Sequence, residues 1–113
     1  MNQVVLVGRL TKNPEIITTK ENTQKTQITI AVSRNFKNVD GIYETDLIDI
    51  TLWNGIAENT ANYCNKGDII GVRGRIQTKI EDDIKITEIV ADRITFLQSS
   101  KQKEQIKEKE NEE

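Results

Sequence analysis

The chain has 113 residues, of which 35% are hydrophobic and 30% charged, which is enough for one small domain without a membrane-spanning segment. It contains one cysteine and no histidine, so an internal disulfide and a zinc site are excluded, and we expect a cytoplasmic protein without metal or cofactor. Its net charge of −2 gives no overall attraction to a polyanion, so nucleic-acid binding would have to depend on where the cations lie.

Alternation of apolar and polar residues predicts strands along most of the chain. The predicted strands cover residues 3–10, 26–36, 43–53, 68–80 and 84–98. The first is apolar on both faces, so it needs cover from its own core and from a partner surface. One helical stretch, "GIAENTANYCNKG", lies between the third and fourth strands. This element order predicts an all-β, five-stranded OB-fold barrel with one short helix.

The last sixteen residues differ in composition from the rest. The segment 98–113 reads "QSSKQKEQIKEKENEE", with Ile106 as its only apolar residue. Such a segment buries too little apolar surface to offset the entropy of ordering. We therefore predict one folded domain over residues 1–97, followed by a charged disordered tail.

Catalysis has little support in the sequence. Histidine, the usual proton shuttle, is absent. Cys64 lies on the apolar stripe of the predicted helix, where a packing role is far more common than a nucleophilic one. The acidic residues at 81–83 are typical of a solvated turn. We expect no enzymatic activity.

The third predicted strand places its aromatic residues on its more polar face. By period-two alternation, Tyr43 and Trp53 share a face with Leu47, while Ile48 and Ile50 share the other. A tryptophan that served only the core would be expected beside the isoleucines. Core packing and exposure to a ligand both remain open for each aromatic taken singly.

The fourth predicted strand carries a basic row. Arg73, Arg75 and Lys79 share one face, about 20 Å long, with no acidic residue of that strand between them. Gly71 and Gly74 leave the surface low enough for another backbone to approach. The alternative is an ordinary solvated face.

A third group of candidates ends the second strand, in "SRNFKN". Phe36 lies between Arg34 and Lys37, but alternation points it inward unless a bulge intervenes or the strand ends early. Aromatic side chains interleaved with Arg and Lys on a small barrel are typical of a single-stranded nucleic-acid platform, where bases stack on rings and cations follow the phosphates. The candidate binding residues are Arg34, Phe36, Lys37, Tyr43, Trp53, Arg73, Arg75 and Lys79.

Several segments together resemble the bacterial and phage single-stranded-DNA-binding protein family. They are "MNQVVLVGRLTKNPEI", "ITIAVSRNF", "DLIDITLWNGIAENTANYCNKGD", "GVRGRIQTK" and "TEIVADRITFL", in the family's order. The resemblance implies that Phe36 and Trp53 stack bases and that the protein is a homotetramer. Two further family aromatics are missing here, one at Leu47 and one in the hairpin "KIEDD".

The tail also departs from the family pattern. Members that recruit other replication proteins end in an acidic tip closed by Pro and Phe, whereas this chain ends "KEKENEE". From the resemblance we expect single-stranded DNA as the partner. From the missing tip we expect that the chain does not recruit replication proteins in this way. Two alternatives remain: a dimeric primosome-type OB accessory protein, and an OB module that binds only protein.

Overall fold

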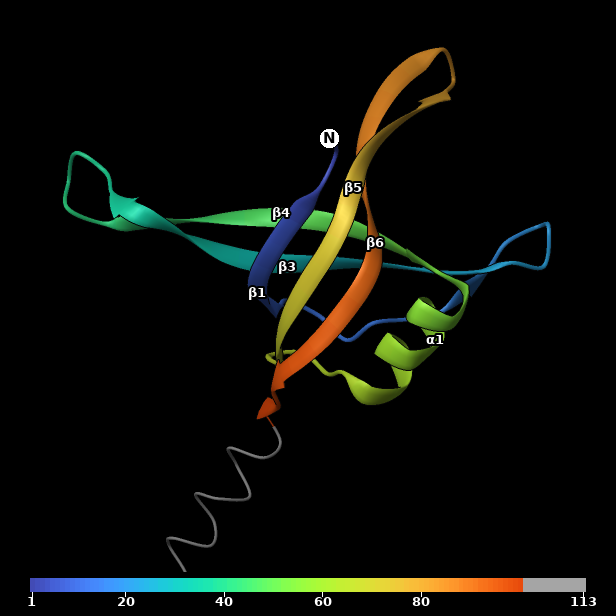
Figure 1. Ribbon diagram of the computed structural model, residues 1–113, viewed down its shortest axis with the longest axis horizontal. Helices are drawn as coiled ribbons and strands as arrows, with labels where there is room; N and C mark the ends of the chain where they lie inside the picture. The colour runs from blue at the N-terminus through green and yellow to red at the C-terminus, as the bar shows by residue number, and fades with distance from the viewer. Residues whose placement is uncertain (101–113) are drawn as a thin grey trace, which may run out of the picture.

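The computed structural model describes residues 1–100 and consists of a single sheet with one helix (Figure 1). The strands are β1 (Val4–Leu10), β2 (Ile17–Thr18), β3 (Gln24–Lys37), β4 (Tyr43–Trp53), β5 (Ile69–Glu81) and β6 (Ile84–Gln98). The helix, α1 (Asn54–Tyr63), lies between β4 and β5. No helix in this part of the chain is long and apolar enough to cross a membrane.

The sheet closes on itself. Its strand order is β1-β5-β6-β4-β3-β2, and β1 also pairs with β3 through Arg9–Ala31 and Leu10–Ile30. The five long strands therefore form a barrel, to which the two-residue β2 is added beside β3. The expected all-β OB-fold is confirmed, with the helix at the expected place between the third and fourth long strands.

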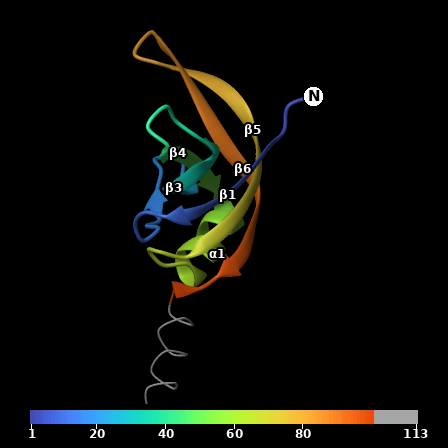
Figure 2. The same ribbon diagram turned by 90° about the vertical axis from the view of Figure 1, so that its left-hand side faces the viewer.

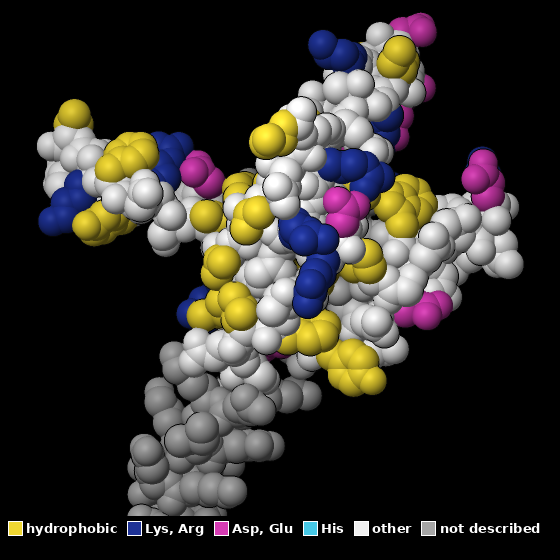
Figure 3. All heavy atoms as spheres, in the orientation of Figure 1, with side chains coloured by type: hydrophobic (Ala, Val, Ile, Leu, Met, Phe, Trp, Pro, Cys, Tyr) yellow, Lys and Arg dark blue, Asp and Glu magenta, His cyan; other side chains and the backbone are white. Residues whose placement is uncertain are grey.

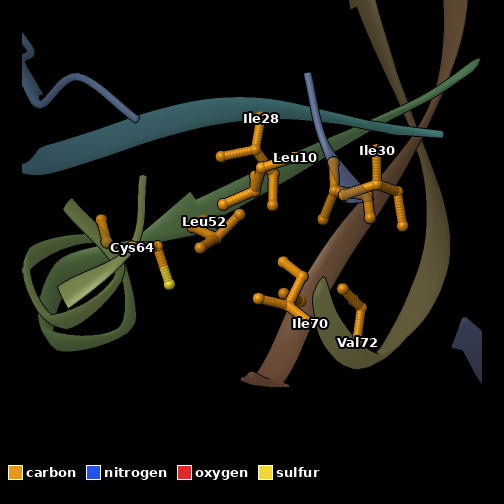
Figure 4. Close-up of a cluster of buried hydrophobic side chains, with 10 residues drawn as sticks. Leu10, Ile28, Ile30, Leu52, Cys64, Ile70 and Val72 are labelled. Atoms are coloured by element: carbon orange, nitrogen blue, oxygen red, sulfur yellow. The ribbon is translucent and has the colours of Figure 1, made fainter. Parts of the chain in front are cut away.

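The barrel interior is filled by branched aliphatic side chains from every long strand (Figure 4). Ile28, Ile30 and Ile50 are fully buried, in agreement with the alternation of their strands. Helix α1 packs against β3, β4 and β6 and contributes Ala57 to the same core. The helix begins at Asn54, and Trp53 occupies the N-cap position without a side-chain capping hydrogen bond.

Cys64, directly after α1, belongs to this core. Its side chain is buried, and removal from water, together with the negative charge of Asp68, raises the pKa of its thiol to about 11. A thiol of that kind is almost entirely protonated at neutral pH and therefore a poor nucleophile. The packing role expected for Cys64 is confirmed.

Two hairpins extend beyond the barrel in different directions (Figures 1 and 2). From Ser33 onward β3 is exposed on both faces, because no opposite wall remains to cover it. Its register with β4 also shifts between Ser33 and Lys37, which adds two residues to β3 and leaves the alternation of its side chains unchanged. Phe36 is therefore freed because this part of the strand extends beyond the core, and not because a bulge turns it. Phe36 is 62% exposed.

The end of β6 is fixed by Asp68. This buried carboxylate accepts hydrogen bonds from the backbone N–H and the hydroxyl of Ser100, at 2.8 and 3.0 Å. Residues 98–100, which the sequence assigned to the tail, are thus attached to the barrel. The remainder of the predicted disordered tail, 101–113, lies outside the described residues.

Gly74 has a different role from the one that the sequence indicated. It is buried, and a Cβ at this position would lie 2.2 Å from the carbonyl oxygen of Val90. The approaching backbone is therefore that of β6, at the point where the β5–β6 register shifts between Arg73 and Gly74. The glycine permits a close strand contact within the barrel and does not face a ligand.

We predict that Gly74→Ala lowers the free energy of unfolding by at least about 1–3 kcal/mol, because a fixed backbone carbonyl cannot move aside for the new methyl group. Thermal unfolding followed by circular dichroism measures this. Gly55→Ala is the matched control, since a Cβ there meets nothing within 4 Å and helix propensity favours alanine. Equal melting temperatures for Gly74→Ala and the parent protein would contradict the prediction.

Candidate nucleic-acid interface

The β3–β4 ribbon has one face toward the core and one directed away from it. Its core face contains pairs such as Ile28–Ile50, and the alternate pairs define what we call the outer face. The outer-face pairs are Lys25–Trp53, Gln27–Thr51, Thr29–Asp49, Ala31–Leu47 and Ser33–Thr45, followed beyond the bulge by Lys37–Tyr43. Trp53 and Tyr43 therefore lie on one face, as predicted from alternation, about 33 Å apart along the strand.

Each of these two rings has a lysine above it. Lys25 Nζ lies 5.2 Å from the ring centroid of Trp53, and Lys37 Nζ lies 5.6 Å from that of Tyr43. Both are cation–π contacts between register partners, worth about 0.5–1 kcal/mol at exposed sites. The sequence interpretation missed Lys25, because its position opposite Trp53 depends on the strand register.

The middle of the outer face is open and partly apolar. Leu47 is 69% exposed, whereas Asp49 brings a negative charge and accepts a hydrogen bond from the Thr29 hydroxyl at 2.6 Å. Beside this region, a groove of about 460 Å³ separates β4 from the β5–β6 hairpin. Leu47, Ile86 and Lys79 are among its lining residues.

Glu88 connects the aromatic strand to the basic row. Its carboxylate accepts hydrogen bonds from Thr51 on β4 at 3.3 Å and from Gln77 on β5 at 2.8 Å, and it lies 3.5 Å from Lys79 Nζ. Burial opposes its ionisation, but these donors outweigh that effect and lower the pKa of Glu88. Because Thr51 is an outer-face residue, the basic row lies on the same face as Trp53.

Carboxylates from neighbouring positions pair with the cations of this row. Arg75 Nη1 lies 2.5 Å from Asp92 of β6, and Lys79 Nζ lies 3.1 Å from Glu81, which together with Glu88 raises the pKa of Lys79. Figure 3 shows the result as Lys and Arg side chains over β5 and β6 with an acidic group among them. The row is uninterrupted along β5 but partly neutralised across the sheet.

Arg73 has different surroundings from Arg75. It lies opposite Val5 of β1 and opposite Arg93 of β6, and it forms no ion pair with any of residues 1–100. Two arginines directly across a strand pair repel each other. This location makes Arg93 a further cation of the same face, which the sequence interpretation missed.

Arg34 does not join the aromatic residues of the outer face. It forms ion pairs with Glu44 and with Asp46, the latter at 2.9 Å. The Arg34 hydrogen bond lowers the pKa of Asp46, and the same contact raises that of Arg34. Since Glu44 and Asp46 alternate with Tyr43 and Thr45, Arg34 lies on the opposite side of the ribbon.

A family model described as the single-strand binding protein family matches residues 1–97. The chain belongs to this family. It is 46% identical over 101 residues to single-stranded DNA-binding protein B of Bacillus subtilis, covering 85% of this chain and 89% of the relative. It is 41% identical over 110 residues to single-stranded DNA-binding protein 1 of Clostridium acetobutylicum, covering 90% and 98%.

Other similar proteins are longer than this chain. The single-stranded DNA-binding protein of Streptococcus mutans is 43% identical over 104 residues, which is 88% of this chain but 63% of that relative. A crystal structure of a deletion mutant of the single-stranded DNA binding protein from Thermus aquaticus superposes with a TM-score of 0.75. At 23% identity, over 88% of this chain and 52% of the other, it supports the fold alone.

Family membership also decides the question of catalysis. Members of the single-strand binding protein family are DNA-binding proteins without enzymatic activity. The expectation that this chain is not an enzyme is therefore confirmed.

Proposed function

We propose that this protein binds single-stranded DNA with little sequence preference and protects it during replication, recombination or repair in the bacterial cytosol or nucleoid. The main support for the proposal is the outer face of β4, where Trp53 and Tyr43 lie on one side of the ribbon next to cations of β5. Family membership supports the same function. Stacking requires only the π-face of a base, so the binding is largely independent of sequence.

The proposed path of the strand follows the outer face. Bases stack on Trp53 at one end of the ribbon and on Tyr43 at the other, and on Phe36 where the strand passes around the hairpin, at about 1–3 kcal/mol for each stacked base. Lys37 lies over Tyr43 and can bind the adjacent phosphate. The groove beside Leu47 lets the chain pass toward Lys79 and Arg75.

Two cations on this path, Arg75 and Lys79, are already paired with carboxylates. A phosphate that approaches Arg75 or Lys79 has to compete with Asp92 or with Glu81 and Glu88. Exposed ion pairs are worth little in water, so this competition is weak enough for a polyanion to overcome. Arg34, on the opposite side of the ribbon, binds a phosphate only where the strand passes around the hairpin.

Trp53 is the only tryptophan of the chain, so its fluorescence reports on this site. Adding oligo-dT should quench its fluorescence, because a stacked base contacts the indole ring, and binding should weaken as salt rises. A fluorescence titration at several salt concentrations measures both effects. Duplex DNA, whose bases are not available for stacking, should compete poorly.

The anisotropy of a labelled oligo-dT provides the control for that titration. Binding by anisotropy without a change in Trp53 emission would remove Trp53 from the site. An absence of binding by both probes at low salt would contradict the proposed function and favour an OB module that binds only protein.

Removing single charges tests the basic row. Arg73→Ala and Arg75→Ala should each weaken binding. Arg73→Ala should reduce the slope of log K against log salt by about 0.7, the value expected for one phosphate of a single strand, and Arg75→Ala should reduce it by less, because Arg75 has to leave Asp92 first. Asp92→Asn should strengthen binding, because it removes the carboxylate that competes for Arg75. If both arginine variants bind like the parent across the salt range, the row is an ordinary solvated face.

We also propose that the protein is a homotetramer. Among residues 1–100, Val4–Gly8 of β1 pair only with β5, so the other edge of this stretch has no strand partner there. Val5 and Val7 on the same strand are 68% and 55% exposed. A free strand edge next to exposed valines favours pairing with a second copy.

The molar mass in solution tests this assembly. Light scattering after size exclusion should give about four times the 12.9 kDa chain mass for the parent, following the closed symmetry common in oligomers. Val5→Lys should yield smaller species, since a charge would be buried at the interface. Val39→Lys, at a fully exposed hairpin position, is the matched control and should leave the mass unchanged.

A dimeric parent would contradict the tetramer and favour the primosome-type alternative. An unchanged mass for Val5→Lys would exclude this face of β1 as the interface. The mass of Arg73→Ala should be measured in the same series, because Arg73 lies opposite Val5. An assembly defect in that variant would then not be mistaken for a lost phosphate contact.

A further inference from the structure

We propose that Lys25 is a further contact residue for single-stranded DNA: it lies over Trp53, and its ammonium binds the phosphate of the nucleotide whose base stacks on that ring. The inference rests on the function proposed above and assigns to it a residue outside the candidate set derived from the sequence. Three observations support it: the register of β3 and β4, the lack of an ion pair at Lys25 within residues 1–100, and a second lysine–aromatic pair in the same ribbon.

The register of the ribbon fixes the position of Lys25. Lys25 and Trp53 are directly opposed on neighbouring antiparallel strands, and the ammonium lies 5.2 Å from the ring centroid. Both side chains are half-buried, so the lysine stem covers part of the indole while its charged end stays in water. A base that stacks on Trp53 therefore brings its own phosphate close to this ammonium.

The charge of Lys25 is available to a phosphate. Within residues 1–100, Lys25 forms no ion pair, in contrast to Arg75 and Lys79. Its ammonium contacts the ring of Trp53, and this cation–π contact is weaker than base stacking. A base can therefore take the place of the ammonium on the ring, and the ammonium can move to the adjacent phosphate without breaking a stronger contact.

The same arrangement occurs at the other end of the ribbon. Lys37 lies opposite Tyr43, with its ammonium 5.6 Å from the ring, and it too forms no ion pair with any described residue. Lysine is disfavoured in strands, so two lysines paired in register with the two outer-face aromatics of β4 are unlike a random surface. Each pair supplies one ring for a base and one cation for a phosphate.

The test compares Lys25→Met, Lys25→Arg and Lys20→Met with the parent in titrations of labelled oligo-dT followed by anisotropy over a range of salt. Methionine keeps most of the apolar stem over Trp53 and removes only the charge. We expect Lys25→Met to raise Kd about fivefold, or about 1 kcal/mol, and to reduce the salt slope by about 0.7. Lys25→Arg should keep Kd and the salt slope close to those of the parent, because a guanidinium also stacks on rings and binds phosphate.

Lys20→Met removes the same charge from an exposed position on the β2–β3 connection and should leave the salt slope unchanged. If Lys25→Met keeps the parent's slope, or if Lys20→Met reduces it equally, the contact assigned to Lys25 is wrong while the proposed function stands. If the parent itself does not bind labelled oligo-dT, the proposed function fails and the inference fails with it. A role for Lys25 in packing alone would alter stability but not the salt slope.

Discussion

The antiparallel register of β3 and β4 is the constraint on which the rest of the structure depends. From Lys25–Trp53 to Ser33–Thr45 the two strands pair without a shift, so every second pair faces the core and every other pair faces solvent. Burial of the isoleucine pairs fixes that alternation, since a slip of one residue would expose them all. The outward position of Trp53 is thus a consequence of core packing, and no local turn or bulge is required to produce it.

Electrostatics of this small acidic domain are local. The net charge is −2, and Arg34, Arg75 and Lys79 all have carboxylate partners in the sheet. Binding of a polyanion would then depend on exchange of partners at some cations and on direct contact at others, such as Lys25 and Lys37. A lysine or arginine that leaves a carboxylate for a phosphate gives a smaller net release of counterions. The affinity for single-stranded DNA should therefore depend only modestly on salt for the number of cations present.

The elements, the barrel and the outward face of Trp53 could be predicted from the sequence, because period-two alternation and a helix between strands are local signals. Cross-strand partners could not. Counting back from the Lys37–Tyr43 pair would place Lys25 opposite Gly55, and only the register shift after Ser33 brings it opposite Trp53. Bulges depend on packing across the sheet, so the partners of the basic row on β6 were hidden for the same reason.

The central claim is that unpaired bases stack on the outer face of the β3–β4 ribbon. Photocrosslinking of iodouracil-substituted oligo-dT, followed by peptide mass spectrometry, tests it most directly. The predicted crosslinks are to Trp53 and Tyr43 of that face, and to Phe36 where the strand passes around the same hairpin. Tyr63 and Phe96 form a separate exposed aromatic pair near α1, with ring centroids 6.4 Å apart, and serve as internal controls. Crosslinks confined to that pair, with none on the ribbon, would contradict the claim.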